Sequence, residues 1–401
     1  MPGSRNPPPS RRQAMAAALG GAALAAWPSA KAAPLVPSPS LNQLAAAKGI
    51  RFGSAIAAGP AGARRDGGSI DNPDYAALVT GECGLIVPEN EMKMQALRPG
   101  PDAFDFTRAD RLMAFAAERS LDVRGHNLLW HNTRWLPAWL NDFDFGSRPA
   151  STAERLLTTH VDTVCRRFGS RIRSWDVVNE TIDPDTGEMR QTVLTRHLGD
   201  KVIDIVFHAA REALPDCQLV YNDYMEWEAG NERHRAGVLK LLARLRRDGV
   251  PVDALGLQSH LGGDSDLKGA PGAPQPAAWR SFLEEAAAMG YDFLVTELDM
   301  NDRSLPADPA RRDAAAAAYV RDYLDLTLSF PQTRDVLAWG MTDRFSWLNG
   351  RAPRPDGLPR RPCLYDRDFR PKPMRDAIAA ALRAAPPRPP RAAPRPNPGT
   401  P

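Results

Sequence analysis

Two glutamates in this sequence each follow a short apolar run, and together they could cleave a glycosidic bond. Glu180 follows the run 177–178 after one asparagine, and Glu297 follows the run 293–295 after one threonine. β-Branched and aromatic runs of this kind are typical of strands buried on both faces of a parallel sheet. Glycosidic cleavage requires two carboxyl groups flanking the sugar, one to protonate the leaving oxygen and one to attack or to activate water. Either glutamate alone fits a rim salt bridge equally well, so the prediction rests on the pair.

The elements that would position these glutamates alternate regularly along the chain. Strand-like apolar segments are followed by helix-like amphipathic segments eight times, and one further helix is expected near 41–48. Strict alternation predicts a parallel sheet, and eight units predict that the sheet closes. The predicted fold is α/β, a single (β/α)8 TIM barrel with Glu180 and Glu297 at the C-terminal ends of strands 4 and 7. The strands are expected at 51–57, 85–89, 123–130, up to 180, 219–224, 254–260, up to 297 and 336–343.

Polar and aromatic residues collect where the predicted strands end, and a barrel would bring them to one rim. Tryptophan and tyrosine faces suit the C–H patches of sugar rings, and amides, imidazoles and a lysine suit hydroxyl groups. Core packing is expected instead for Trp175 and Trp279, and a supporting position behind the site is an equally good interpretation for His131 and Asp343. The rim residues are Glu89, Asn90, Lys93, His126, Trp130, His131, Asn222, Asp223, Tyr224, Gln258, His260, Trp339, Asp343 and Trp347.

Five of these rim motifs, in this order along the chain, resemble those of glycoside hydrolase family 10. The resemblance extends from about residue 41 to residue 383 and implies a (β/α)8 barrel with endo-β-1,4-xylanase activity. The closing Pro-Lys-Pro at 371–373 is similar to the end of the family's domain. The motifs are Glu-Asn-Glu-Met-Lys at 89–93, His-Asn-Leu-Leu-Trp-His at 126–131, Trp-Asp-Val-Val-Asn-Glu at 175–180, Gly-Leu-Gln-Ser-His at 256–260 and Thr-Glu-Leu-Asp at 296–299.

The resemblance also implies catalytic roles. Glu180 would be the general acid/base and Glu297 the nucleophile of a retaining double displacement, with carboxyl groups about 5–5.5 Å apart. Asn179 would bind the 2-hydroxyl of the sugar being cleaved. His260, oriented by Asp299, would bind Glu297 and keep it ionised. The charge of Glu297 is expected to be the chief cause of a raised pKa at Glu180.

Substrate contacts follow from the same resemblance, and no cofactor or metal is implied. Tyr224 would face the aglycone side. Three departures from the family pattern bear on subsite binding: Met94 in place of tryptophan, Met225 in place of asparagine, and a longer loop at 132–136. The glycone side would be lined by Glu89, Asn90, Lys93, His126, Trp130, Gln258, Trp339 and Trp347.

Composition sets the limits of this interpretation. The chain has 401 residues, 25% of them charged and 43% hydrophobic, as in an ordinary globular enzyme, and its net charge of +3 disfavours nucleic acid as a partner. Residues 1–32 are predicted to be a twin-arginine-type signal peptide, because Arg11-Arg12 precede a mildly apolar run and an Ala-Lys-Ala site. Residues 33–40 would be a linker, 41–383 the catalytic domain and 384–401 a Pro-rich disordered tail. The mature protein is expected to be an exported monomer, periplasmic or extracellular, without a membrane anchor.

Several alternatives stay open at this point. Another retaining β-glycanase would share the site, and a silent sugar-binding barrel would be expected to lack one of the glutamates. A metal-dependent hydrolase would need the side chains of His126, His131 and His260 to converge on one metal ion. Buried free thiols are expected at Cys83, Cys165, Cys217 and Cys363, although an oxidising compartment would allow three pairings.

Overall fold

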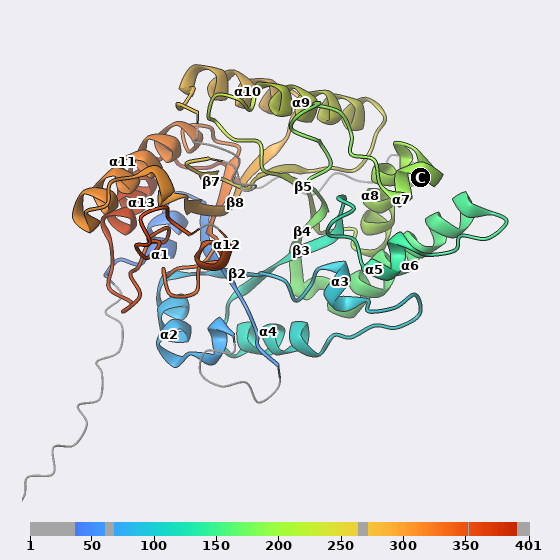
Figure 1. Ribbon diagram of the computed structural model, residues 1–401, viewed down its shortest axis with the longest axis horizontal. Coiled ribbons are helices and arrows are strands. Elements are labelled where there is room, and N and C mark those ends of the chain that lie inside the picture. Colours follow the sequence, from blue (N-terminus) through green and yellow to red (C-terminus); the bar gives the residue numbers. More distant parts are fainter. Residues whose placement is uncertain (1–36, 61–67, 264–271, 352, 391–401) are drawn as a thin grey trace, which may run out of the picture. The chain divides into compact units, whose positions relative to one another are not determined.

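A closed barrel of parallel strands lies at the centre of the structure, a computed structural model that describes residues 37–60, 68–263, 272–351 and 353–390 (Figure 1). Within these residues, eight strands pair in parallel with their sequence neighbours, and pairing of the last with the first closes the barrel. The predicted fold is therefore confirmed. The strands are β1 (Arg51–Ile56), β2 (Leu85–Pro88), β3 (Asp122–Trp130), β4 (Ile172–Asn179), β5 (Gln218–Asp223), β6 (Ala254–Leu257), β8 (Asp292–Met300) and β9 (Thr333–Ala338).

Helices surround the barrel (Figure 1), and each long one lies where the alternation of strands and helices predicted a helix. In the helix α6, for example, Leu157, Val161, Val164 and Phe168 recur at helical spacing and are all buried. The short helices α3, α5, α7 and α12 were not predicted, because one or two turns contain too few positions for a periodicity. The helices are α1 (Leu41–Ala46), α2 (Pro73–Glu82), α3 (Met94–Leu97), α4 (Thr107–Glu118), α5 (Ala138–Asn141), α6 (Pro149–Phe168), α7 (Val193–Leu198), α8 (Lys201–Ala213), α9 (Glu232–Arg247), α10 (Pro276–Ala288), α11 (Pro309–Thr327), α12 (Leu348–Arg351) and α13 (Pro373–Ala384).

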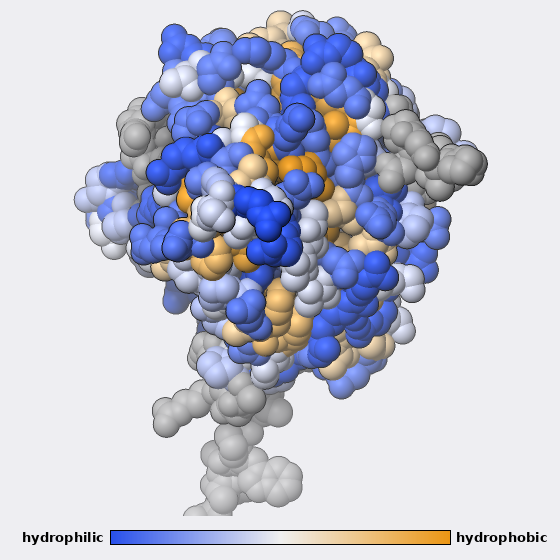
Figure 2. Space-filling model, turned by 90° about the vertical axis from the view of Figure 1, so that its right-hand side faces the viewer, coloured by the Kyte–Doolittle hydropathy of each residue, from blue (hydrophilic) through white to orange (hydrophobic). Residues whose placement is uncertain are grey.

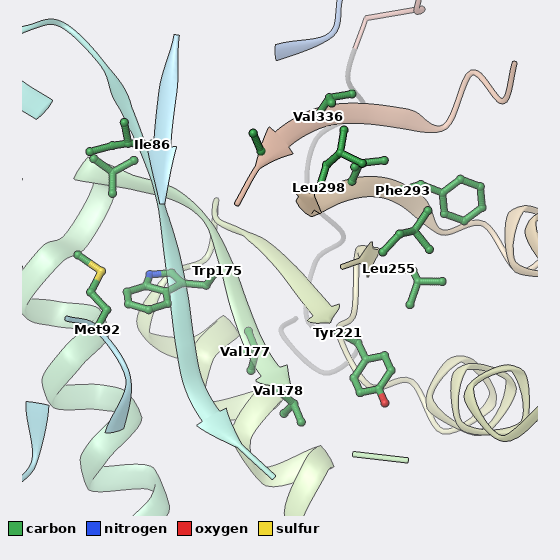
Figure 3. Close-up of a cluster of buried hydrophobic side chains, with 14 of the residues drawn as sticks. Ile86, Met92, Trp175, Val177, Val178, Tyr221, Leu255, Phe293, Leu298 and Val336 are labelled. Atoms are coloured by element: carbon green, nitrogen blue, oxygen red, sulfur yellow. The ribbon is translucent and has the colours of Figure 1, made fainter. Parts of the chain in front are cut away.

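Apolar side chains of several strands, among them Trp175, Val178 and Phe293, belong to one buried cluster, part of which Figure 3 shows. Trp175 and Trp279 are both fully buried, as expected from the sequence. Gly125 of β3 allows this packing, because a Cβ atom there would lie 2.2 Å from the indole of Trp175. On the face of the molecule in Figure 2, hydrophilic residues predominate and surround smaller groups of hydrophobic ones.

The sixth predicted strand is wrong in its extent. The segment predicted as one strand at 254–260 forms β6 and then a separate short strand, β7 (His260–Leu261), which pairs with β8. Between them Ser259 has a φ of +66°, in the left-handed region that residues other than glycine seldom occupy. Glu180 has a φ of +55° directly after β4. Both left-handed residues end a strand at the rim where the polar side chains gather.

Residues far apart in sequence meet around one buried carboxylate, that of Glu82 in α2. Arg375 in α13 donates from Nε to Glu82 Oε1 at 2.8 Å, and Tyr365 donates its hydroxyl to the same oxygen. The backbone N–H of Leu41 at the start of α1 donates to Glu82 Oε2 at 2.6 Å. This cluster joins α1, α2 and α13.

Packing continues past the predicted end of the domain at residue 383. Arg388 is buried and donates from Nε to the carbonyl oxygen of Thr333 and from Nη2 to that of Leu328, each at 2.8 Å. The tail predicted at 384–401 therefore begins with an ordered segment, and its part at 391–401 lies outside the described residues. So does the predicted signal peptide at 1–32, together with the linker as far as residue 36.

The four cysteines, Cys83, Cys165, Cys217 and Cys363, are buried free thiols, as expected. In the part of the chain that the structure describes, no helix is both long enough and apolar enough to span a bilayer.

Candidate active site

A cleft of about 940 Å³, part of it open to solvent, lies at the C-terminal ends of the strands. Glu180 and Glu297 both line it, so the structure brings the two predicted carboxyl groups together. Of the other residues predicted to have a catalytic or substrate-binding role, only Asp299 is absent from the lining, and it lies directly behind His260. The lining residues are Glu89, Asn90, Lys93, Gln95, His126, Trp130, Asn132, Arg134, Trp135, Asn179, Glu180, Tyr224, Gln258, His260, Glu297, Trp339, Trp347 and Arg351.

The carboxyl group of Glu180 is held by three side-chain donors. Trp130 Nε1 donates to Oε2 at 2.8 Å, while Gln258 Nε2 and Asn179 Nδ2 donate to Oε1 at 3.0 and 3.2 Å. Burial is the main cause of a raised pKa at Glu180, against the effect of the donors from Gln258 and Trp130. The sequence-based expectation of its cause was wrong, because the charge of Glu297 contributes less than burial. Glu180 is therefore biased toward its protonated form.

Glu297 is biased in the opposite direction by a charged histidine. His260 Nε2 lies 3.3 Å from Glu297 Oε2, and His260 Nδ1 lies 2.8 Å from Asp299 Oδ1. Burial favours neutral forms here, but the hydrogen bond from His260 lowers the pKa of Glu297 to about 2. Burial likewise opposes the charges of Asp299 and Glu297, which raise the pKa of His260 to about 10. Trp347 Nε1 fixes Asp299 by donating to Oδ2 at 2.7 Å.

One amide connects the two glutamates, and the sequence interpretation gave it no role. Asn222 Nδ2 donates to Glu297 Oε1 at 2.8 Å and to Asn179 Oδ1 at 2.9 Å, and Asn179 in turn donates to Glu180. Thr296 Oγ1 fixes the Asn222 amide by donating to its oxygen at 2.8 Å. The only sequence signal for Asn222 is its position at the end of a predicted strand.

His126 is oriented by a buried ion pair inside the barrel. Its Nδ1 lies 2.8 Å from Asp176 Oδ2, and Arg124 Nη1 donates to the same oxygen at 3.0 Å. Arg124 and Asp176 are at most 1% exposed. Neither was proposed from the sequence, although Asp176 belongs to the motif that contains Glu180.

His131 and Asp343 support the rim from behind and do not line the cleft. His131 Nε2 lies 3.3 Å from Thr192 Oγ1, and burial lowers the pKa of His131 to about 3, so the ring is neutral. Lys372 Nζ donates to Asp343 Oδ1 at 3.0 Å. For these two residues the sequence left open direct sugar contact or a supporting position behind the site, and the structure supports the supporting position.

The histidines named for a possible metal site have separate partners: His126 contacts Asp176, His131 contacts Thr192, and His260 lies between two carboxylates. Within the described ranges, no group of three or more histidine, cysteine, aspartate or glutamate side chains is placed to hold a metal ion. These residues do not fit a metal centre.

The predicted glycone residues form a charged and aromatic wall. Lys93 Nζ donates to Asn90 Oδ1 at 3.0 Å and lies 4.5 Å from the centre of the Trp130 ring. Burial, with a smaller effect from Glu91, raises the pKa of Glu89 to about 7. Such a wall combines apolar contact area with groups that can bind hydroxyls.

Tyr224, predicted on the aglycone side, is held by an arginine that the sequence interpretation did not identify. Arg190 Nη2 donates to the Tyr224 hydroxyl at 2.6 Å, and Arg190 Nε donates to the backbone oxygen of Glu180 at 3.2 Å. The same guanidinium pairs with Asp183 at 3.2 Å. Arg190 therefore ties the predicted aglycone residue to the chain that carries Glu180.

Two of the three departures from the family pattern do not touch the cleft. Met94 and Met225 are buried in the core, at 2% and 1% exposure, and neither lines the site. The longer loop at 132–136 differs from them, because it contributes Asn132, Arg134 and Trp135 to the lining.

A parallel barrel with two carboxyl groups in one cleft, one with a raised and one with a lowered pKa, is typical of one class of protein, the barrel glycosidases. Comparison with known proteins gives the family. Residues 40–381 match the model of glycosyl hydrolase family 10. The chain belongs to this family, as its motifs predicted.

Named relatives agree with this assignment. The chain is 33% identical over 349 residues to endo-1,4-beta-xylanase 3 of Hypocrea jecorina, covering 86% of each protein, and 30% identical over 310 residues to endo-1,4-beta-xylanase B of Thermotoga neapolitana, covering 77% of this chain and 83% of that one. Among solved structures, native xylanase 10B from Thermotoga maritima is similar with a TM-score of 0.73 and 30% identity, over 86% of this chain and 98% of the other. Xylanase 10B from Thermotoga petrophila RKU-1, in complex with xylobiose, gives a TM-score of 0.73 and 29% identity over 87% and 98%.

Proposed function

We propose that this family 10 enzyme is an endo-β-1,4-xylanase that hydrolyses internal bonds of xylan with retention of anomeric configuration. The observation that carries the proposal is that two carboxyl groups line one cleft and have opposite pKa shifts, with a raised pKa at Glu180 and a pKa of about 2 at Glu297. The names of the relatives and the xylobiose complex of the Thermotoga petrophila enzyme support xylan as the substrate.

In the first step Glu297 attacks the anomeric carbon while Glu180 transfers its proton to the glycosidic oxygen. The bond to the aglycone breaks, and an ester forms between the sugar and Glu297. His260 keeps Glu297 ionised until this point. When the ester forms, Glu297 loses its negative charge, so His260 no longer faces that charge. Asn179 is the group proposed to bind the 2-hydroxyl of the same sugar.

In the second step Glu180, now ionised, takes a proton from water as the water attacks the anomeric carbon. The ester breaks, Glu297 regains its charge and Glu180 regains its proton. Two inversions give net retention, which requires carboxyl groups about 5–5.5 Å apart. Packing of Lys93, Trp339 and Trp347 is proposed to exclude the hydroxymethyl group that glucose carries and xylose lacks.

The stereochemical outcome tests this proposal directly. Proton NMR during hydrolysis of linear β-1,4-xylan is expected to show the β-anomer of the new reducing end first, followed by mutarotation. First appearance of the α-anomer would refute the double displacement. A parallel assay on carboxymethylcellulose is expected to give much lower activity, and comparable activity on both polymers would instead assign a broader β-glycanase.

Replacement of the acid/base should separate the two steps. In Glu180→Ala, loss of proton donation is expected to reduce kcat on xylan by about 10²–10⁴-fold. Aryl xylobiosides whose leaving groups need no proton should lose far less in the first step. Glu297→Ala is the matched comparison, and it should abolish hydrolysis of both substrates. Steady-state kinetics on the two substrates provide the measurement, and equal losses in Glu180→Ala would contradict the assigned role.

A further inference from the structure

The proposed acid/base, Glu180, is held both by its side chain and by its backbone. Inside the cleft, Trp130 donates to the carboxyl group at 2.8 Å, and the ring of Trp130 stacks on that of Trp135, with centroids 4.6 Å apart and an interplanar angle of 17°. The backbone N–H of Glu180 donates to the carbonyl oxygen of Asn222 at 2.9 Å. The carbonyl oxygen of Glu180 is bound by Arg190, which lies outside the set of residues that line the cleft.

Arg190 ends a short hairpin that begins directly after Glu180. Its backbone N–H donates to the carbonyl oxygen of Thr181 at 2.8 Å, and Ile182 pairs with Met189 in an antiparallel bridge. The hairpin therefore returns the chain to the residue that carries the proposed acid. Glu180 has a φ of +55°, a conformation that persists in residues other than glycine only where the surroundings hold it. The hydrogen bond from Arg190 is one of the contacts that hold this backbone.

The guanidinium group of Arg190 uses a different nitrogen for each of three acceptors. Nε donates to the Glu180 carbonyl oxygen at 3.2 Å, Nη1 to Asp183 Oδ2 at 3.2 Å and Nη2 to the Tyr224 hydroxyl at 2.6 Å. The side chain of Arg190 is 17% exposed, so these bonds are largely shielded from water. Because a guanidinium group is planar and rigid, it fixes its acceptors relative to one another.

Of the three acceptors, the Tyr224 hydroxyl belongs to the side chain that is proposed to face the aglycone sugar. The Tyr224 ring packs edge-on against His234, with centroids 4.8 Å apart, and the Tyr224 N–H donates to Asp223 Oδ1 at 2.8 Å. His234 Nε2 lies 3.1 Å from the same oxygen, and both His234 and Asp223 are fully buried. Buried residues thus hold Tyr224 from behind, and Arg190 joins its hydroxyl to the backbone of Glu180.

We propose that Arg190 is a positioning residue for proton transfer, which aligns the aglycone sugar, through Tyr224, with the carboxyl group of Glu180. This inference rests on the proposed function, because it concerns the acid/base of that mechanism. A leaving group that needs a proton depends on this alignment, and a leaving group that departs as a stable anion does not. Loss of Arg190 should therefore slow cleavage most when the leaving group is a sugar.

The experiment compares two substrates of the same enzyme, xylotetraose and dinitrophenyl xylobioside. Xylotetraose leaves a sugar that needs a proton, whereas the dinitrophenolate departs without one. In Arg190→Met, kcat/KM on xylotetraose is expected to fall by about 10²-fold, the effect of a misplacement of about 1 Å. The loss on the aryl substrate should be about tenfold smaller. A general loosening of the structure would instead reduce both values equally.

The matched control is Arg233→Met, which removes an arginine from the outer side of the same hairpin. Arg233, an exposed residue of α9, donates to the carbonyl oxygen of Asp185 at 2.5 Å. This variant should lose no more than about twofold, and equally on both substrates. Arg190→Lys keeps the charge but offers one nitrogen to three acceptors, so it should retain only part of the rate on xylotetraose. Far-ultraviolet circular dichroism checks that each variant is folded.

The link to the aglycone side is tested by removing the hydroxyl that Arg190 binds. In Arg190→Met/Tyr224→Phe, the loss on xylotetraose should be smaller than the product of the two single losses, because both act through one contact. Single losses that multiply would overturn the link between Arg190 and Tyr224.

An equal loss on both substrates in Arg190→Met, or an undiminished rate on xylotetraose, would overturn the inference while the wild-type enzyme still hydrolyses xylotetraose. Failure of the wild-type enzyme to hydrolyse any xylan or xylo-oligosaccharide would overturn the proposed function, and the inference with it. The same assays therefore distinguish the two failures.

Discussion

At the scale of single residues, the cleft separates two chemically identical carboxyl groups by their surroundings. Glu180 is partly buried among neutral donors, and burial is the dominant effect on its pKa. Glu297 faces an imidazolium that is held by a second carboxylate, Asp299. The proposed mechanism requires Glu297 ionised and Glu180 protonated in the free enzyme, so kcat/KM should follow a bell-shaped dependence on pH.

The acid limb of that profile should depend on His260. In His260→Gln the positive charge beside Glu297 is lost, so the pKa of Glu297 should rise from about 2 toward its ordinary value near 4.5. A smaller fraction of Glu297 is then ionised in mildly acidic solution, and the acid limb of kcat/KM should move to higher pH. The measurement is a pH profile of both enzymes, with His208→Gln, at a histidine of α8 outside the cleft, as the control. A fixed acid limb would contradict this account of the ion pair.

The sequence could predict site residues that are marked by their neighbours in the chain. It missed residues whose role depends on partners that are distant in the chain. Glu180 and Glu297 could be found because each follows an apolar run at the end of a strand. Arg124 and Arg190 could not, because the carboxylate or hydroxyl that each one binds lies far away in the chain. The cause of the raised pKa at Glu180 was wrong for the same reason, since burial is a property of the folded barrel.

At the scale of elements, the ends of the strands carry the irregularities that form the site. β4 is followed directly by a left-handed Glu180, and the sixth predicted strand is interrupted by a left-handed Ser259. A non-glycine residue in this conformation costs on the order of 1–3 kcal/mol and persists only where its surroundings hold it. Ser259 is held by hydrogen bonds from its hydroxyl to the Leu257 oxygen, at 3.0 Å, and with the Tyr323 hydroxyl, at 2.7 Å.

A glycine in β6 is expected to control the position of the Asn222 amide, which connects Glu297 to Glu180 through Asn179. A Cβ atom at Gly256 would lie 2.2 Å from Asn222 Oδ1, and Asn222 is fully buried and bound by Thr296. Gly256→Ala should therefore displace Asn222 from Glu297 and lower kcat by about 10²-fold, with a loss of about 1–3 kcal/mol in the free energy of unfolding. The matched control is Gly100→Ala, where the nearest atom to a new Cβ is 3.7 Å away. Wild-type kcat in Gly256→Ala would rule out this role for Asn222.

Elements were predictable where a repeating pattern is long enough to be seen. The long helices and the strands satisfy this condition, whereas the short helix α12, which ends in Arg351, does not. The left-handed residues have no local signal, because serine and glutamate are compatible with a regular strand. Their conformation follows from tertiary contacts that a pattern of apolar residues does not contain.

At the scale of the whole molecule, the cluster around Glu82 joins the first and last helices of the barrel domain. Glu82 is fully buried and Arg375 is 3% exposed, so removal of one partner leaves an uncompensated charge. Arg375→Met is expected to reduce the free energy of unfolding by about 3–5 kcal/mol. Urea unfolding provides the measurement, and kcat of the folded variant should stay near the wild-type value because neither residue lines the cleft.

The double variant Glu82→Gln/Arg375→Met is the control for that prediction. It removes both charges, so it should regain part of the stability lost in the single variant. A double variant that is less stable than Arg375→Met would show that the charge on Glu82 is not the cause.

Closure of the barrel was predictable from the number of strand–helix alternations. The side-chain contacts that join the first and last helices were not predictable. Glu82 and Arg375 are separated by 293 positions, and no local pattern indicates such a partner. The Pro/Arg/Ala-rich composition after residue 383 predicted disorder, yet Arg388 packs against backbone oxygens of Leu328 and Thr333. The composition of a segment does not indicate that one of its side chains, here Arg388, can bind buried backbone oxygens elsewhere in the fold.

The stacked indoles of Trp130 and Trp135 also have an optical consequence. Two parallel rings 4.6 Å apart couple their electronic transitions, so the enzyme without substrate should show an exciton couplet in its ultraviolet circular dichroism. Trp135→Leu should abolish that couplet. Because Trp130 also donates to Glu180, a change in the couplet during titration with an inhibitor would report movement beside the proposed acid/base without any label.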